Sequence, residues 1–144
     1  MELDSLYQEV ILDHYRSPHH KGLSANKDIQ VHHNNPSCGD EVTLNLSMKG
    51  GVVTDLTWDG VGCSISMAST SVMSDLLVGK GYKDAVNILD NFVELMQSKG
   101  QSVGDESILE DAVAFAGVSK FPARIKCALL GWMAFKDASS QVMQ

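Results

Sequence analysis

The sequence predicts an α+β fold, in which a small three-stranded antiparallel sheet has several helices packed on one face. Two observations carry this prediction. Apolar and polar residues alternate over residues 29–33, 42–48 and 52–58, whereas from Cys63 onward the apolar residues recur at helical spacing. Apart from an opening helix, the strands come as one block before the helices. This order argues against the strand–helix alternation of a parallel sheet.

The first half of the chain is expected to form one helix and three strands. Apolar residues recur at helix spacing over residues 3–11, and Pro18 ends this helix. The turn Lys49-Gly50-Gly51 lies between the two clearest alternating runs, which predicts an antiparallel hairpin. The shorter run at 29–33 is expected to add the third strand.

The second half is expected to be helical. Two apolar stripes span residues 65–76 and 85–96, and each is followed within a few residues by a glycine that suits a helix end. A further helix is expected to open near Ser107 and continue through about Ala116. Pro122 suits the first position of a last helix, since its missing N–H is not needed there.

Length and composition narrow the classes of function. The chain has 144 residues and a mass of 15.6 kDa, which predicts a single domain over residues 1–144. Its net charge of −7 argues against nucleic-acid binding and against a polybasic membrane patch. No secretory signal is apparent, and no stretch approaches the roughly 20 apolar residues of a membrane span. We therefore expect a cytoplasmic protein.

The chain has three cysteines, and such a small and odd number does not make a disulfide framework. Cys38 lies in a polar loop between two expected strands. Cys63 lies where a helix begins, and the free N–H groups and dipole of a helix N-terminus favour a thiolate. At about 100° per residue, Cys127 points away from the apolar stripe of the last helix, on the side of Arg124. The alternative is that each cysteine is a small buried hydrophobic residue.

Asp40 supplies a possible fourth ligand. It lies two residues after Cys38, so the two side chains can point to the same side of an extended or turning segment. Three thiolates and one carboxylate suit a tetrahedral zinc ion or an iron–sulfur cluster. Neither C-x-x-C nor H-x-x-x-H occurs, so spacing alone leaves the metal site as one interpretation beside the buried-cysteine one.

Three motifs, one around each cysteine, resemble those of the IscU/NifU/SufU family of iron–sulfur cluster assembly scaffolds. They are residues 35–40 (NPSCGD), 60–66 (GVGCSIS) and 123–127 (ARIKC). The family fold is a small antiparallel sheet with packed helices. IscU-type members carry a His before the third cysteine, in a Leu-Pro-Pro-Val-Lys segment, whereas Lys126 stands at that position here. A second difference from IscU-type members is an additional stretch at about residues 98–120. With these two differences, the chain resembles the SufU-type branch of the family.

The resemblance to this branch implies a zinc ion bound by Cys38, Asp40, Cys63 and Cys127. It also implies a sulfur acceptor and carrier rather than a stand-alone enzyme. Its partner would be a pyridoxal-phosphate-dependent cysteine desulfurase of the SufS type, and the sulfur would pass on to downstream cluster assembly or thiol-recipient proteins. Cys38, in the glycine-containing loop, is the expected sulfur acceptor once docking of the desulfurase frees it from zinc. Arg124 is expected either to steady a thiolate or the Asp40 carboxylate, or to form a surface ion pair.

Two alternatives use the same residues. One is an IscU-type scaffold that assembles and transfers a [2Fe–2S] cluster on the same four ligands. The other is a structural zinc module that activates the desulfurase by contact alone. Zinc and iron share these ligand types, so the ligands do not decide between them.

Overall fold

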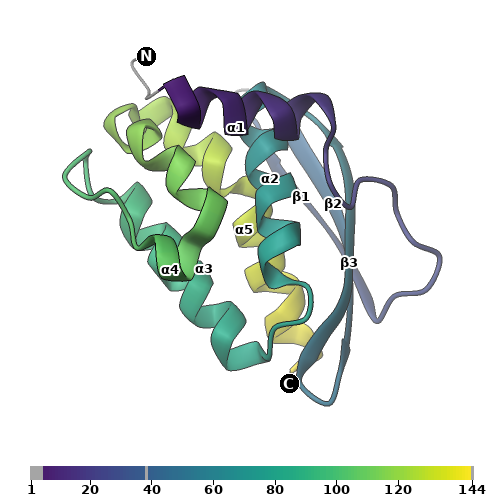
Figure 1. The fold of residues 1–144 in the computed structure, drawn as a ribbon. Coiled ribbons are helices and arrows are strands. Elements are labelled where there is room, and N and C mark those ends of the chain that lie inside the picture. The colour runs from purple at the N-terminus through teal and green to yellow at the C-terminus, as the bar shows by residue number, and fades with distance from the viewer. Residues whose placement is uncertain (1–4, 38, 144) are drawn as a thin grey trace.

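A sheet of three antiparallel strands forms one layer of this computed structural model, which describes residues 5–37 and 39–143 (Figure 1). The strands are adjacent in chain order: β1 (Ile29–Asn35), β2 (Asp40–Lys49) and β3 (Val52–Val61). All three predicted strands are confirmed. The predicted hairpin between β2 and β3 is present as well, and both Gly50 and Gly51 adopt positive φ angles (58° and 77°) in its turn.

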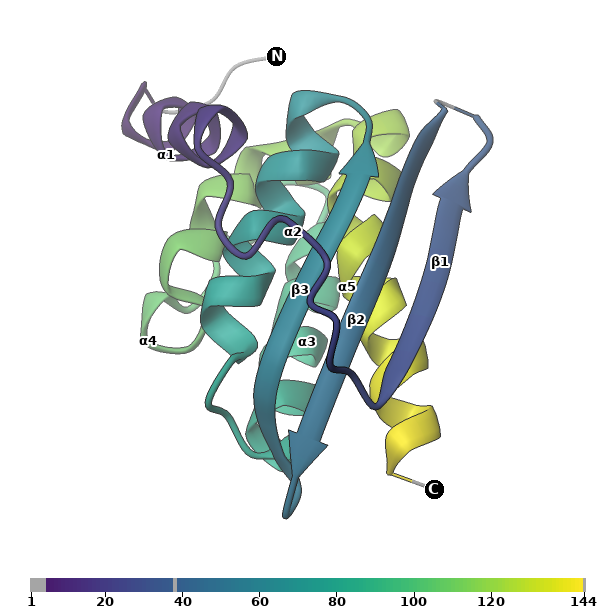
Figure 2. The same cartoon turned by 90° about the vertical axis from the view of Figure 1, so that its right-hand side faces the viewer.

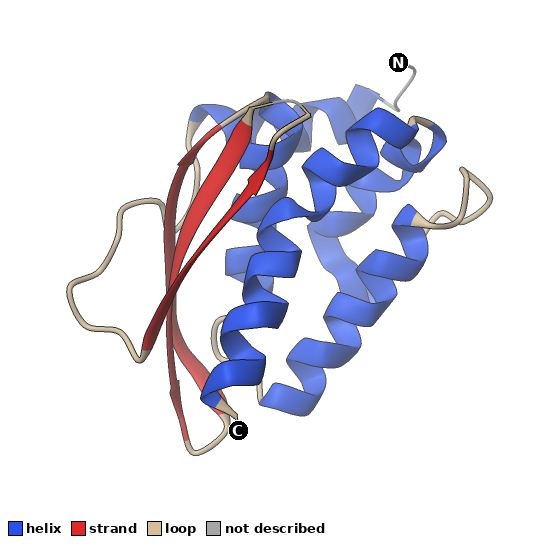
Figure 3. Ribbon diagram, turned by 180° about the vertical axis from the view of Figure 1, so that it is seen from behind, coloured by secondary structure: helices blue, strands red, loops and turns tan. Residues whose placement is uncertain are grey.

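The helices form the second layer of the molecule and cover one face of the sheet (Figure 3). They are α1 (Ser5–Arg16), α2 (Ser64–Leu77), α3 (Tyr82–Met96), α4 (Glu106–Leu109), the 3-10 helix η1 (Glu110–Lys120) and α5 (Pro122–Val142). This arrangement confirms the predicted α+β class. No helix in the described ranges is long and apolar enough to cross a membrane.

The core lies between the sheet and the helices. Leu44 on β2 is paired with Val31 on one side and Trp58 on the other, and all three side chains are buried. The segment between α1 and β1 crosses the opposite face of the sheet (Figure 2). There, the carbonyl of Ser24 accepts a hydrogen bond from the buried amide of Asn45 at 2.9 Å. The helices and this segment thus cover both faces.

The expected helix over residues 107–116 is wrong in its details. The α-helical part is the short α4, whose N-cap is Asp105; its carboxylate accepts the Ser107 N–H at 3.0 Å. Glu110 then adopts a φ of 46°, which is incompatible with a continuing α-helix, and the chain continues as the 3-10 helix η1.

The predicted orientation of Cys127 is also wrong. Cys127 is 1% exposed, and Gly131 and Ala134 on the same side of α5 are buried with it. Leu129 and Met133, which were expected to face the core, are only partly buried. The reason is that α5 packs against the sheet on one side and against α2, α3 and η1 on others. A helix surrounded in this way is not amphipathic, so its apolar stripe does not identify its inner side.

Candidate metal centre

Asp40, Cys63 and Cys127 converge at one end of the sheet. Asp40 is the first residue of β2, Cys63 directly precedes α2, and Cys127 lies in the second turn of α5. One ligand atom from each residue lies within 4.8 Å of the other two. Cys38, the fourth predicted ligand, lies outside the described residues, although Ser37 and Gly39 on either side of it belong to the turn after β1. The structure therefore brings together three of the four predicted ligands.

The carboxylate of Asp40 is held rigidly at the N-terminus of α2. Asp40 is 2% exposed, and its Oδ1 accepts the backbone N–H of Cys63 at 3.0 Å. Its Oδ2 accepts a hydrogen bond from the hydroxyl of Ser66. Cys63 is the N-cap of α2, at the helix start that the sequence predicted, and its own side chain forms no capping hydrogen bond. Instead, the Asp40 carboxylate on β2 binds the backbone N–H of this N-cap residue. The positive end of the helix dipole also favours an anion at this point.

The two thiols lie against this carboxylate. The Sγ of partly buried Cys63 is 3.6 Å from Asp40 Oδ2 and 3.4 Å from Ser66 Oγ. The thiol of buried Cys127 lies 3.8 Å from the carbonyl of Ala123. A buried carboxylate beside two thiols is costly without a cation once the thiols ionise. Two sulfurs and one carboxylate oxygen are ligands that zinc accepts, so the residues present fit the ion.

Ser66 takes part in this arrangement although the sequence analysis did not single it out. Its hydroxyl lies between Asp40 and the Cys63 thiol. The available signal was its spacing, since a residue three positions after an N-cap lies on the same side of the first helical turn. Arg124 lies in the first turn of α5 and is exposed, and within residues 5–37 and 39–143 it forms no ion pair with a carboxylate. Its supporting role stays a prediction.

Gly62 permits the close approach between Asp40 and the segment that carries Cys63. A Cβ atom at Gly62 would lie 2.7 Å from Asp40 Oδ1 and 2.8 Å from its Cγ, which are distances that real side chains do not tolerate. The carboxylate has no room to move aside, because Cys63 and Ser66 both hydrogen-bond to it.

We predict that Gly62→Ala displaces the Asp40 carboxylate and weakens zinc binding by about 10- to 100-fold, the range seen when a group that orients a ligand is lost. Zinc affinity would be measured by competition with a chromophoric chelator. Gly81→Ala is the matched control, because a Cβ at Gly81 meets nothing within 4 Å. Equal zinc affinities for the two variants would contradict the prediction.

Comparisons with known proteins identify the family of this chain. The family model for the NifU-like N-terminal domain matches residues 6–128. The zinc-dependent sulfurtransferase SufU of Bacillus subtilis is 46% identical over 134 residues, covering 93% of this chain and 89% of the relative. The iron–sulfur cluster assembly scaffold protein IscU of Streptococcus pyogenes is 41% identical over 138 residues, covering 95% and 84%.

A solved structure extends the similarity to the fold. The N-terminal domain of a NifU-like protein from Brucella abortus superposes with a TM-score of 0.87 at 26% identity, over 95% of this chain and 94% of that one. The match to the family model covers the three strands and all three cysteines. The chain therefore belongs to the family of NifU-like N-terminal domains that includes SufU and IscU.

Proposed function

We propose that this protein is a zinc-binding sulfur acceptor that takes persulfide sulfur from a cysteine desulfurase and passes it to iron–sulfur cluster assembly. The observation that supports this most directly is the convergence of Asp40, Cys63 and Cys127 within 4.8 Å. These three residues, together with Cys38, would hold the zinc ion. The ion would keep the thiols deprotonated at neutral pH and join three distant segments of the chain.

The four ligands have different roles in this proposal. Cys127 is buried within α5 and Asp40 is held by two hydrogen bonds, so both are retaining ligands. The backbone N–H of Cys63 is hydrogen-bonded to the Asp40 carboxylate, so Cys63 is retained with them. Cys38, which lies between β1 and β2 in the sequence, is the acceptor. Arg124, in the exposed first turn of α5, would steady the carboxylate or the released thiolate.

The transfer step conserves atoms and electrons. The Cys38 thiolate attacks the outer sulfur of the desulfurase persulfide, and a new S–S bond forms at Cys38. The old S–S bond breaks, and the partner's cysteine leaves as a thiolate. No external oxidant or reductant is needed.

The surface around the site suits a docked partner. Val61 is an apolar residue with 62% of its surface exposed, and the neighbouring Gly62 is also exposed. Both precede Cys63 directly, so a protein that covers them reaches the centre. This supports a desulfurase, whose persulfide must come within bonding distance of a thiolate, as the partner.

Transfer of radiolabelled sulfur from a pyridoxal-phosphate-dependent cysteine desulfurase tests the assignment. Cys38→Ser is expected to lose labelling to background, because the thiol that would accept the sulfur is removed while Cys63 and Cys127 stay bound to zinc. Ser37→Ala, at the adjacent position in the sequence, is the control and should be labelled normally. Labelling of Cys38→Ser at the normal rate would show that another group accepts the sulfur. Stimulation of the desulfurase without labelling of the unsubstituted protein would favour activation by contact.

The second candidate is a scaffold for a [2Fe–2S] cluster, since relatives that are 41% and 32% identical carry the name IscU scaffold. Metal analysis of freshly purified protein distinguishes the two. The sulfur-acceptor proposal expects a colourless protein with one equivalent of zinc. A brown protein with iron and acid-labile sulfide would overturn it in favour of the scaffold.

A further inference from the structure

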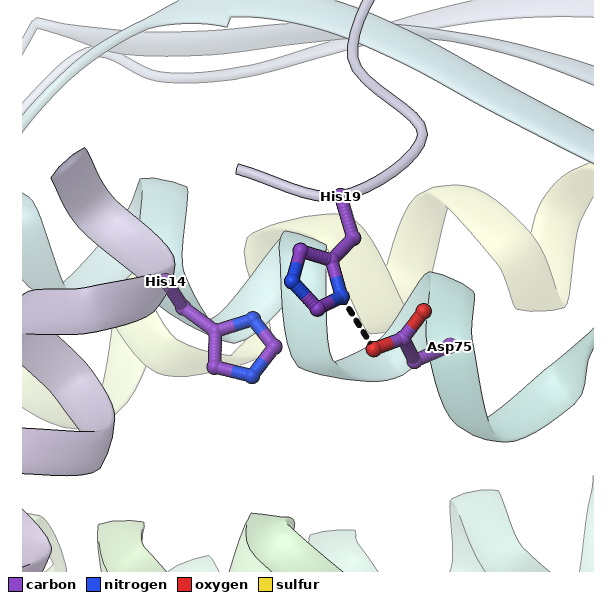
Figure 4. A group of neighbouring side chains, drawn as sticks. All are labelled: His14, His19 and Asp75. Atoms are coloured by element: carbon purple, nitrogen blue, oxygen red, sulfur yellow. Dashed lines mark hydrogen bonds and ion pairs between the residues drawn. The ribbon is translucent and has the colours of Figure 1, made fainter. Parts of the chain in front are cut away.

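A second group of metal-ligating side chains lies away from the cysteines. His14 at the end of α1, His19 in the following segment and Asp75 near the end of α2 each place one ligand atom within 4.8 Å of the other two. The two imidazole rings are neighbours, with centroids 4.5 Å apart and planes tilted by 45°, and the Asp75 carboxylate lies beside the His19 ring (Figure 4). Asp75 is about 18 Å along α2 from Cys63 at 1.5 Å rise per residue, so the two groups are separate.

We propose that His14, His19 and Asp75 form a second metal site, which binds a divalent zinc ion through two imidazole nitrogens and one carboxylate oxygen. Zinc readily accepts this ligand set, with one position left for water. The set contains no thiolate, so it differs in chemistry from the cysteine centre. The proposal does not depend on the sulfur-acceptor function.

His14 is the preorganised ligand of the group. Its side chain is 7% exposed, and its Nδ1 lies 2.7 Å from Ser71 Oγ. The same hydroxyl accepts the backbone N–H of His19 at 2.7 Å, so one side chain of α2 positions both histidines. Burial, followed by the neighbouring His19, lowers the pKa of His14. A neutral imidazole can bind a metal ion without first losing a proton.

The other two ligands can adjust. The side chains of His19 and Asp75 are 49% and 42% exposed, and His19 Nδ1 is hydrogen-bonded to Asp75 Oδ2. An ion would replace the proton shared by these two atoms. The three ligand atoms lie within 4.8 Å of one another, and rotation of the two exposed side chains can bring each of them to the length of a zinc bond, about 2.0–2.2 Å. The second oxygen of Asp75 lies 3.1 Å from His20 Nε2, which keeps the carboxylate turned toward this segment.

The surroundings favour a cation. A pocket of about 130 Å³ next to the group is lined by His14 and by three acidic residues, Asp75, Glu110 and Asp111. Asp111 lies 3.9 Å from His14 Nε2. On the other side, a second pocket brings Asp13 and Arg16 to the same histidine. Acidic groups thus outnumber the basic one around the site, and the pocket has room for the water that completes the coordination.

Zinc titration of tag-free protein that already carries one equivalent of zinc tests the proposal. Calorimetry is expected to show a second equivalent, with an affinity that falls from pH 7.5 to pH 5.5 because protons compete for the histidines. His19→Gln and Asp75→Asn should each weaken this second event at least 10-fold and leave the first equivalent in place. His32→Gln is the matched control, because His32 is an exposed histidine that is hydrogen-bonded to Thr43, lies near Glu41 and is away from the proposed site.

Imidazole ¹H–¹⁵N spectra of the unsubstituted protein provide a readout that does not depend on any variant folding. The second equivalent of zinc should move the signals of His14 and His19 and leave that of His32 in place. Absence of a second binding event, or a second event that moves the signal of His32 and leaves those of His14 and His19 in place, would overturn the proposal.

Discussion

Replacing Cys127 with serine is expected to abolish tight binding of the proposed zinc ion. Cys127 is the most buried of the described ligands, and the other described thiol, Cys63, is itself a proposed ligand and cannot take its place. A direct ligand should matter more than a residue that only orients one, so the zinc affinity should fall by more than about 100-fold. At saturating zinc, each hundredfold loss of affinity removes about 2.7 kcal/mol of zinc-dependent stability.

The design separates loss of metal from loss of packing. Unfolding would be followed with denaturant for the unsubstituted protein and for Cys127→Ser, each with zinc and with a chelator. The two proteins should differ strongly with zinc and little without it. Ala134→Ser is the control, because it places a hydroxyl on the same buried side of α5 away from the centre. Retention of one equivalent of zinc by Cys127→Ser at normal affinity would contradict the assignment of Cys127 as a ligand.

Replacing Gly131 with alanine is expected to lower the free energy of unfolding by about 1–3 kcal/mol, the usual cost of overpacking. A Cβ at Gly131 would lie 2.4 Å from Thr70 Oγ1 and 3.0 Å from Thr70 Cβ, so α2 and α5 would have to separate. Alanine is otherwise the better helix former by up to about 1 kcal/mol. A destabilised variant would therefore show that the helix contact outweighs propensity.

Thr70→Ala provides the matching partner for a double-mutant cycle. It removes the hydroxyl that the new Cβ would meet, so the double variant should recover part of the loss, with a coupling of about 0.5–3 kcal/mol. Strictly additive effects would show that the two residues do not clash. Gly131 lies one turn after Cys127 on α5, and Cys63 directly precedes α2. A separation of α2 from α5 would therefore move the two thiols apart, so Gly131→Ala should also weaken zinc binding.

Local patterns were sufficient to predict most of the fold. The alternation on β2 and β3 and the turn at Gly50 and Gly51 identified the hairpin, because side chains on a strand point alternately to opposite faces. The start of α2 at Cys63 was predicted as well. The helix near Ser107 was predicted too long: Asp105 caps its start, and the positive φ of Glu110 ends it after Leu109.

The metal centre was predicted only in part. Cysteines in three motifs pointed to a shared site, and the convergence of Asp40, Cys63 and Cys127 is consistent with it. Cys127 was expected on an outward side of α5, whereas it is buried. Helical periodicity cannot identify the inner side of a helix that is surrounded by other elements.

By itself, the sequence determined the order and type of the elements, because hydrophobic period and turn residues are properties of neighbouring positions. The tertiary structure decided which distant side chains meet. Three such contacts join residues far apart in the chain. They are the hydrogen bond from Ser66 to Asp40, the contact of Gly131 with Thr70, and the cluster of Asp75 with His14 and His19. These contacts depend on how α1, α2 and α5 pack against one another and the sheet, and no local pattern encodes that packing.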